Sequence, residues 1–66
     1  MALYRCLLRD LAGVPLEATS TISNADAGAR QYALRLLRKL HYVQYVDVWR
    51  DSDFVFRMSR FHLSAD

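Results

Sequence analysis

Residues 23–41 read SNADAGARQYALRLLRKLH and predict one amphipathic helix of about five turns. Ser23 takes the position of an N-cap, and the Asp26 side chain can accept a hydrogen bond in return, as in a capping box. The negative charge of Asp26 is also favourable near the positive end of the helix dipole. Basic residues crowd the last turns, where they complement unpaired carbonyl groups: Arg35, Arg38, Lys39 and His41. The apolar residues share one broad stripe: Ala25, Ala29, Tyr32, Ala33, Leu36, Leu37 and Leu40. Such a helix needs an apolar surface to lie on.

Four segments around this helix show strand patterns, either a two-residue alternation or a high content of β-branched and aromatic residues. They cover residues 3–11, 16–22, 42–50 and 54–61, with turns at 12–15 and 51–53. Residues 16–22 are weakly apolar, so we predict an edge strand there, with an irregular loop as the alternative. The pattern ends near His62, and residues 63–66 are expected to form a flexible tail of a single domain, 1–66.

The order of these segments defines the fold class. One helix covers only one face of a sheet, so we predict an α+β fold, a two-layer β-β-α-β-β sandwich with a mainly antiparallel sheet. The residues expected to face the helix alternate along the strands: Tyr4, Cys6, Leu8, Val46, Val48, Phe54, Phe56 and Met58. The pattern does not specify the order of the strands in the sheet.

Length and composition bear on assembly. A chain of 66 residues forms one domain near the lower size limit for unaided folding, and 53% of its residues are hydrophobic. So much apolar content exceeds what a small interior holds, and leftover apolar surface favours self-association. We therefore expect a homodimer or a larger assembly. The formal net charge of +2 is too small to indicate nucleic-acid binding by itself.

The cysteine content and the N-terminus bear on the compartment. Cys6 is the only cysteine, which excludes an internal disulfide and is typical of a reducing environment. The N-terminus lacks the pattern of a signal peptide, and no apolar run approaches the roughly 18 residues of a membrane span. We expect a soluble, cytoplasmic protein that makes no membrane contact.

Several sequence features, taken in their order along the chain, carry a resemblance to other proteins. They are the Tyr4-Arg5-Cys6 start, the reversal near Gly13, the acidic helix opening at Asp26, and the Val48-Trp49 strand end before an arginine-containing last strand. In these features the sequence resembles small uncharacterised proteins common in alphaproteobacteria. It departs from their pattern at residues 51–53, where Asp, Ser and Asp replace the usual glycine. The resemblance implies the same kind of fold and no particular activity.

Few residues offer catalytic or metal chemistry. Cys6 could act as a nucleophile with His41 or His62 as its base, but it lies in mid-strand on the predicted core face, where a free cysteine behaves as a small hydrophobe. A metal site from Cys6, His41, His62 and Asp47 lacks closely spaced ligands, and the 51–53 turn lacks the further oxygens of a calcium loop. No glycine-rich loop is present to hold a nucleotide. We therefore predict neither enzymatic activity nor a cofactor.

The sheet face turned away from the helix is the predicted interaction surface. Its residues are Arg5, Leu7, Arg9, Tyr45, Trp49, Val55 and Arg57. Aromatic and arginine side chains on a sheet can stack unpaired bases, and they also dominate the binding energy of protein interfaces. Because the net charge is low and Asp47 and Glu17 are assigned to this face, we favour protein contact, first as a homodimer. Single-stranded nucleic-acid binding is the alternative.

Overall fold

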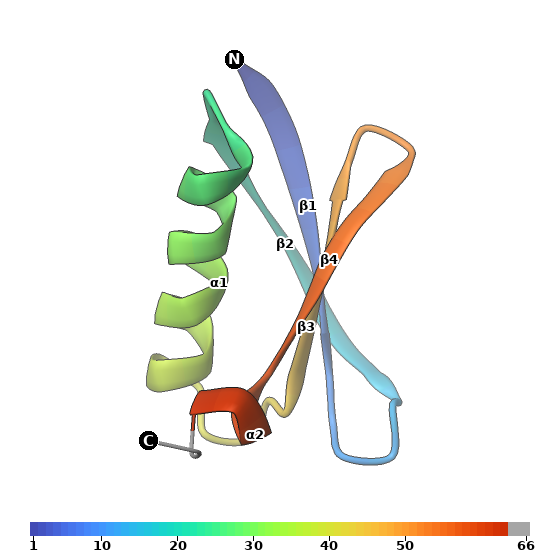
Figure 1. The fold of residues 1–66 in the computed structure, drawn as a ribbon. Coiled ribbons are helices and arrows are strands. Elements are labelled where there is room, and N and C mark those ends of the chain that lie inside the picture. Colours follow the sequence, from blue (N-terminus) through green and yellow to red (C-terminus); the bar gives the residue numbers. More distant parts are fainter. Residues whose placement is uncertain (64–66) are drawn as a thin grey trace.

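A single sheet of four strands, covered on one face by a long helix, makes up the fold (Figure 1). The computed structural model describes residues 1–63. Its elements are β1 (Ala2–Arg9), β2 (Pro15–Ser23), α1 (Asp26–Lys39), β3 (Tyr45–Arg50), β4 (Asp53–Ser59) and a short α2 (Arg60–Leu63). The strands are antiparallel in the order β2-β1-β3-β4. The predicted α+β class and the β-β-α-β-β order are confirmed, and so is the edge position of the second strand.

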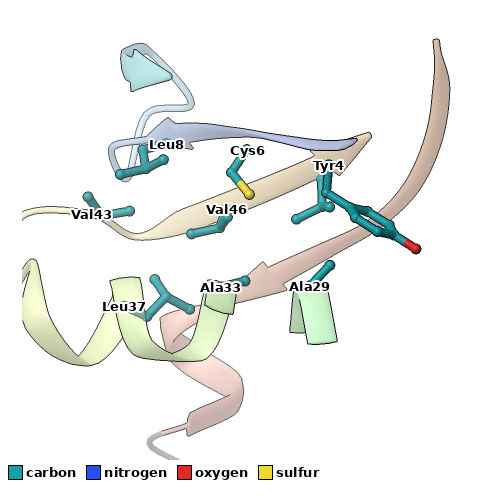
Figure 2. Packing of buried hydrophobic residues seen from close by; sticks show 9 residues of the cluster. Tyr4, Cys6, Leu8, Ala29, Ala33, Leu37, Val43 and Val46 are labelled. Atoms are coloured by element: carbon teal, nitrogen blue, oxygen red, sulfur yellow. The ribbon is translucent and has the colours of Figure 1, made fainter. Parts of the chain in front are cut away.

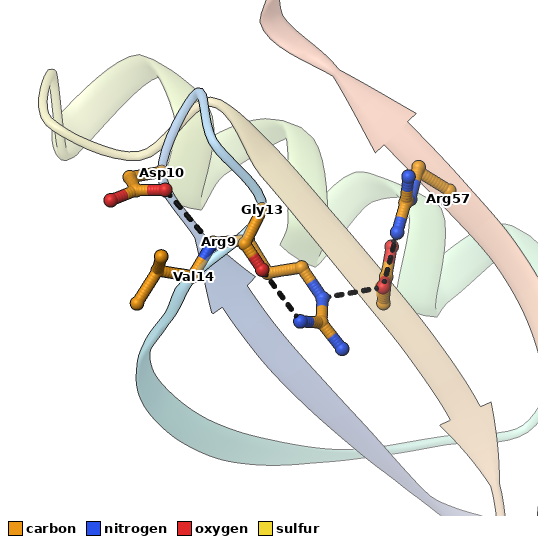
Figure 3. Close-up of polar contacts among 6 residues, drawn as sticks. Arg9, Asp10, Gly13, Val14 and Arg57 are labelled. Carbon is orange, nitrogen blue, oxygen red and sulfur yellow. Dashed lines mark hydrogen bonds and ion pairs between the residues drawn. The ribbon is translucent and has the colours of Figure 1, made fainter.

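The tight turns that close the two hairpins depend on backbone conformations that few residues adopt. In the first hairpin, Gly13 has a φ of 85°, and the Asp10 carboxylate accepts the backbone N–H of Val14 at 2.9 Å (Figure 3). In the second, Asp51 takes the left-handed conformation with a φ of 57°, which aspartate tolerates better than most residues. Both reversals are therefore short and locally determined.

The core lies between α1 and the facing side of the sheet (Figure 2). Its fully buried side chains are Tyr4, Cys6, Leu8, Ala29, Ala33, Leu37, Val43, Val46 and Val48. Phe56 and Met58 are partly buried and pack against them. These buried residues confirm the predicted alternation in β1 and β3 and the central part of the helical stripe. The small side chains of Ala29 and Ala33 let the helix approach the sheet closely.

The helix begins later than predicted, and its predicted cap is wrong. Ser23 still belongs to β2, and its hydroxyl donates to the carbonyl of Ala25 at 2.8 Å. Ala25 is the N-cap residue, without a side-chain capping bond, and it is exposed rather than part of the buried stripe. Asp26 instead accepts hydrogen bonds from the Tyr4 hydroxyl at 2.6 Å and from Arg50 at 3.0 Å. A contact across the fold replaces the local capping box.

A bulge in β4 reverses two predicted side-chain directions. Val48 pairs with Phe56 and Trp49 pairs with Phe54, which leaves Val55 as an extra residue without a pairing partner. Phe54 therefore lies on the same face as Trp49, away from the helix, and 55% of it is exposed. Val55 packs against the core cluster. The predictions that Phe54 faces inward and Val55 outward are both wrong, because one extra residue shifts the alternation.

The end of the chain differs from the predicted strand and tail. The last strand stops at Ser59, and α2 extends to Leu63, the first residue of the predicted tail. Residues 64–66 of that predicted tail lie outside the described residues. The Arg60 guanidinium donates to the carbonyl of Leu37 in the last turn of α1 and to the carbonyls of Leu40 and Val43, which follow the helix. A distant arginine thus satisfies carbonyls that the last helical turn leaves free.

Candidate interaction surface

The sheet face opposite α1, here called the outer face, carries the predicted interaction residues in cross-strand rows. Pairing places side chains beside one another in three rows: Ser20, Arg5, Trp49 and Phe54; then Ala18, Leu7, Asp47 and Arg57; then Arg9, Tyr45 and Ser59. All of the predicted surface residues lie in these rows except Val55, which the bulge removes. Phe54 takes its place beside Trp49.

An ion cluster around Asp47 occupies the middle of the outer face. Arg57 donates from Nε to Oδ1 at 2.6 Å and from Nη2 to Oδ2 at 2.9 Å, and Arg9 donates from Nε to Oδ2 at 2.9 Å. Arg9 also donates to the carbonyl of Gly13 at 2.8 Å, as Figure 3 shows. The Asp47 side chain is only 4% exposed. One buried carboxylate therefore ties together β1, β3 and β4.

The arginines determine the charge state of this carboxylate. Burial alone would raise the pKa of Asp47, but the hydrogen bonds from Arg57 and Arg9 outweigh it and hold the pKa below its usual value. Asp47 is therefore ionised near neutral pH, and both arginines are engaged in neutralising it. Neither guanidinium is free to bind a ligand without weakening this cluster.

An aromatic and apolar region lies at one end of the outer face. Trp49 and Phe54 meet edge to face, with ring centroids 5.4 Å apart. Leu3 and Ile22 pair across β1 and β2 at the same end and are 47% and 64% exposed. Phe54, Leu3 and Ile22 are absent from the predicted interaction set. The alternation of β1 already places Leu3 on this face, whereas Phe54 and Ile22 require the bulge and the strand pairing.

A hollow of about 360 Å³ opens beside Trp49. Its lining residues are Arg5, Cys6, Leu7, Ala18, Trp49, Asp51 and Ser52. Within residues 1–63, the side chain of Arg5 makes no ion pair or hydrogen bond, so its guanidinium is available to a ligand. Asp51 also lines the hollow. The hollow thus combines apolar walls with one charge of each sign.

The opposite end of the outer face holds Tyr45. The Arg57 guanidinium lies 5.2 Å from the centre of its ring, and the ring of Phe61 packs at a tilt with centroids 6.3 Å apart. This aromatic side chain therefore has two close neighbours.

Fewer acidic residues lie on the outer face than the sequence predicts. Glu17 pairs with Leu8, whose side chain is in the core, so Glu17 lies on the helix side of the sheet. There it accepts a hydrogen bond from the Tyr42 hydroxyl at 2.6 Å, and this bond raises the pKa of Tyr42. Its assignment to the outer face is wrong, because the pairing of β2 with β1 determines which side it takes.

Other chemistry on the described chain is limited. Cys6 is buried, and desolvation raises the pKa of its thiol to about 11, which leaves it protonated near neutral pH. Among residues 1–63, no three His, Cys, Asp or Glu side chains gather closely enough to hold a metal ion. In the same part of the chain, neither helix has the length and apolar character needed to cross a bilayer.

The fold and the outer face together define a small α+β domain with one sheet face that α1 leaves uncovered within residues 1–63. No family model, no curated protein and no solved structure matches this chain.

Proposed function

We propose that this protein is a non-enzymatic association module that forms a homodimer through its outer face. The observation that carries the proposal is the exposed aromatic region around Trp49 and Phe54, on a sheet whose other face is covered by α1. Trp, Tyr and Arg supply most of the binding energy at protein interfaces. We place the module in the cytoplasm, which is supported by its single, free cysteine.

The features around the hollow favour a second copy as the partner. Phe54 projects from the face with more than half of its surface exposed, and the hollow beside Trp49 offers a site of matching apolar character. Arg5 and Asp51 line the same hollow with opposite charges. In a two-fold arrangement, Arg5 of one copy can meet Asp51 of the other. A self-complementary patch of this kind is what a symmetric dimer requires.

Single-stranded nucleic-acid binding is the second candidate. It is favoured by the partly exposed ring of Trp49 beside the unpaired side chain of Arg5, and by the absence of Glu17 from this face. Against it, Arg9 and Arg57 are engaged with Asp47, which leaves few charges for a phosphate chain. Backbone recognition requires several such cations. We therefore rank protein association first.

Sedimentation equilibrium from low to high micromolar concentration tests the proposal. We expect the wild-type protein to associate and Trp49→Ala to raise the dissociation constant by about tenfold or more, since a central tryptophan at an interface costs that much when truncated. Leu11→Ala is the matched control, because Leu11 is an exposed apolar residue in the first hairpin turn, outside the outer face. Circular dichroism should show both variants folded. A strict monomer at high micromolar concentration would overturn the proposal.

A titration with mixed-sequence oligonucleotides at low salt separates the two candidates. The second candidate requires binding that weakens steeply as salt is added. A lack of binding at low salt excludes nucleic-acid binding. If the protein is a monomer whose oligonucleotide binding weakens with salt and is abolished by Trp49→Ala, nucleic-acid binding replaces the dimer as the proposed function.

A further inference from the structure

The sheet has two free edges, and they differ in how far they are protected. The strand β2 spans nine residues, and β1 is its neighbour on one side. No backbone hydrogen bond from another described segment reaches its outer side. The N–H and C=O groups of every second residue in this strand therefore point outward from the edge and can pair with another strand.

The other edge strand, β4, carries features that discourage pairing. The bulge at Val55 distorts its ladder, and its charged residues Asp53 and Arg57 flank that bulge. The strand leads directly into α2. Bulges and charges of this kind are the usual protection of an exposed edge.

By comparison, β2 is long and nearly uncharged. It contains no lysine or arginine, its proline stands at the first position, and its pairing with β1 is regular from Glu17 to Ser23. Glu17 is its one charged residue. The threonine-rich remainder favours extended backbone. Nothing within this strand opposes the addition of another strand.

We infer that β2 pairs antiparallel with β2 of a second copy, which joins the two sheets into one continuous sheet. A two-fold axis through Thr19 places Ala18 opposite Ser20 of the second copy and Glu17 opposite Thr21 of the second copy. In this register the residues of each face stay on that face. No like charges stand opposite one another, so the edge is complementary to itself.

This contact is separate from the proposed association of the outer faces. The edge pairing uses backbone groups of β2, and Glu17 and Thr21 lie on the helix side of the sheet. The inference therefore goes beyond the proposed function and can hold or fail by itself. If both contacts form, the edge-paired sheets present two outer faces side by side.

Opposite charges at position 21 test the register. Thr21→Lys places a cation opposite Glu17 of the second copy and should tighten association by about threefold or more, whereas Thr21→Glu should weaken it by a similar factor. Adding Glu17→Lys to Thr21→Glu restores an attractive pair and should recover the association. All variants are made in the Trp49→Ala background, so that failure of the outer-face contact does not obscure the result. The measurement is sedimentation equilibrium, with thermal melting of dilute protein to report the stability of each single copy.

Hydrogen exchange provides a second measurement that needs no substitution at the edge. Amides of β2 that face outward should exchange more slowly as the protein concentration rises, while outer amides of β4 should not change. Equal effects of Thr21→Lys and Thr21→Glu would overturn the inference. Exchange in β2 that is independent of concentration would also overturn it, even if a charged variant at position 21 fails to fold.

Discussion

Arg57 on β4 donates hydrogen bonds to both carboxylate oxygens of Asp47 on β3, at 2.6 Å and 2.9 Å, in the middle of the outer face. A carboxylate buried in this way destabilises a fold unless its charge is matched by hydrogen-bonded partners. Arg9 on β1 completes the set at 2.9 Å. The cluster therefore makes strand pairing and charge neutralisation depend on each other.

Asp47→Asn should lower the free energy of unfolding by about 2 kcal/mol, because charge-assisted hydrogen bonds become neutral ones and two arginines lose their counter-ion. Urea denaturation measures the change. Asp53→Asn is the matched control, since Asp53 is an exposed carboxylate at the start of β4 and does not line the hollow. An equal loss in the two variants would contradict a special role for the cluster.

Stability should fall in acid because of the same carboxylate. Hydrogen bonds from Arg57 and Arg9 outweigh the opposing effect of burial, so the pKa of folded Asp47 lies below its unfolded value of about 3.9. A group with a depressed pKa stabilises the fold above the unfolded pKa, and this contribution is lost as the pH falls through the folded pKa. Melting temperatures should therefore stay level from neutral pH to about pH 5 and decline below about pH 4. Asp47→Asn should decline less steeply over the same acid range.

Tyr4→Phe should lower the melting temperature, because the hydroxyl of this buried tyrosine donates to Asp26 at the start of α1. The hydrogen bond to Asp26, with burial, raises the pKa of Tyr4 above its usual value. Tyr42→Phe is the control, since it removes a hydrogen bond of equal length to Glu17 on an exposed part of the surface. Thermal melting should show the larger loss for Tyr4→Phe. A larger loss for Tyr42→Phe would contradict the importance of the contact between β1 and the helix start.

Arg60→Ala should destabilise the protein by about 2 kcal/mol, because it leaves carbonyl groups near the end of α1 without their donor. Arg60→Lys should recover part of the loss, since an ammonium cannot reach several carbonyls with the fixed fork of a guanidinium. Urea unfolding curves compare the variants. Full recovery by lysine would mean that charge, and not the pattern of donors, is what matters at this position.

Cys6 should resist modification in the folded protein. Burial raises the pKa of its thiol to about 11, so the reactive thiolate is scarce and the sulfur is covered. A thiol-specific reagent near neutral pH should react only after denaturation. Rapid reaction of the native protein would contradict this and would reopen a chemical role for Cys6.

The periodicity of the chain was sufficient to predict the layers and most of the core. Tyr4, Cys6 and Leu8 alternate without interruption in β1, and Val46 and Val48 do so in β3, so the buried side of each strand follows from its own pattern. The helical stripe contains Ala29, Ala33 and Leu37, all fully buried. Local pattern and tertiary packing agree at these positions, which is why the prediction holds.

Features that depend on the pairing of distant segments could not be predicted in this way. The sides taken by Glu17 and Phe54 follow from the register of their strands, and the register includes a bulge that alternation alone does not reveal. Arg60 contacts the end of α1 from more than 15 residues away in the chain, because it follows a strand that returns beside the helix. The outer face was predicted in outline, while its most exposed aromatic residue was assigned to the core.

The extra residue at Val55 also bears on how this surface can change over evolutionary time. Without that offset, Val55 would stand across from Trp49 and Phe54 would turn toward the helix, although every amino acid in the hairpin stayed the same. The aromatic character of the exposed patch therefore depends on the phase of one ladder as well as on which side chains are encoded. A shift of this ladder by one residue is therefore enough to exchange a ring for an aliphatic side chain at this end of the outer face, with no change of sequence.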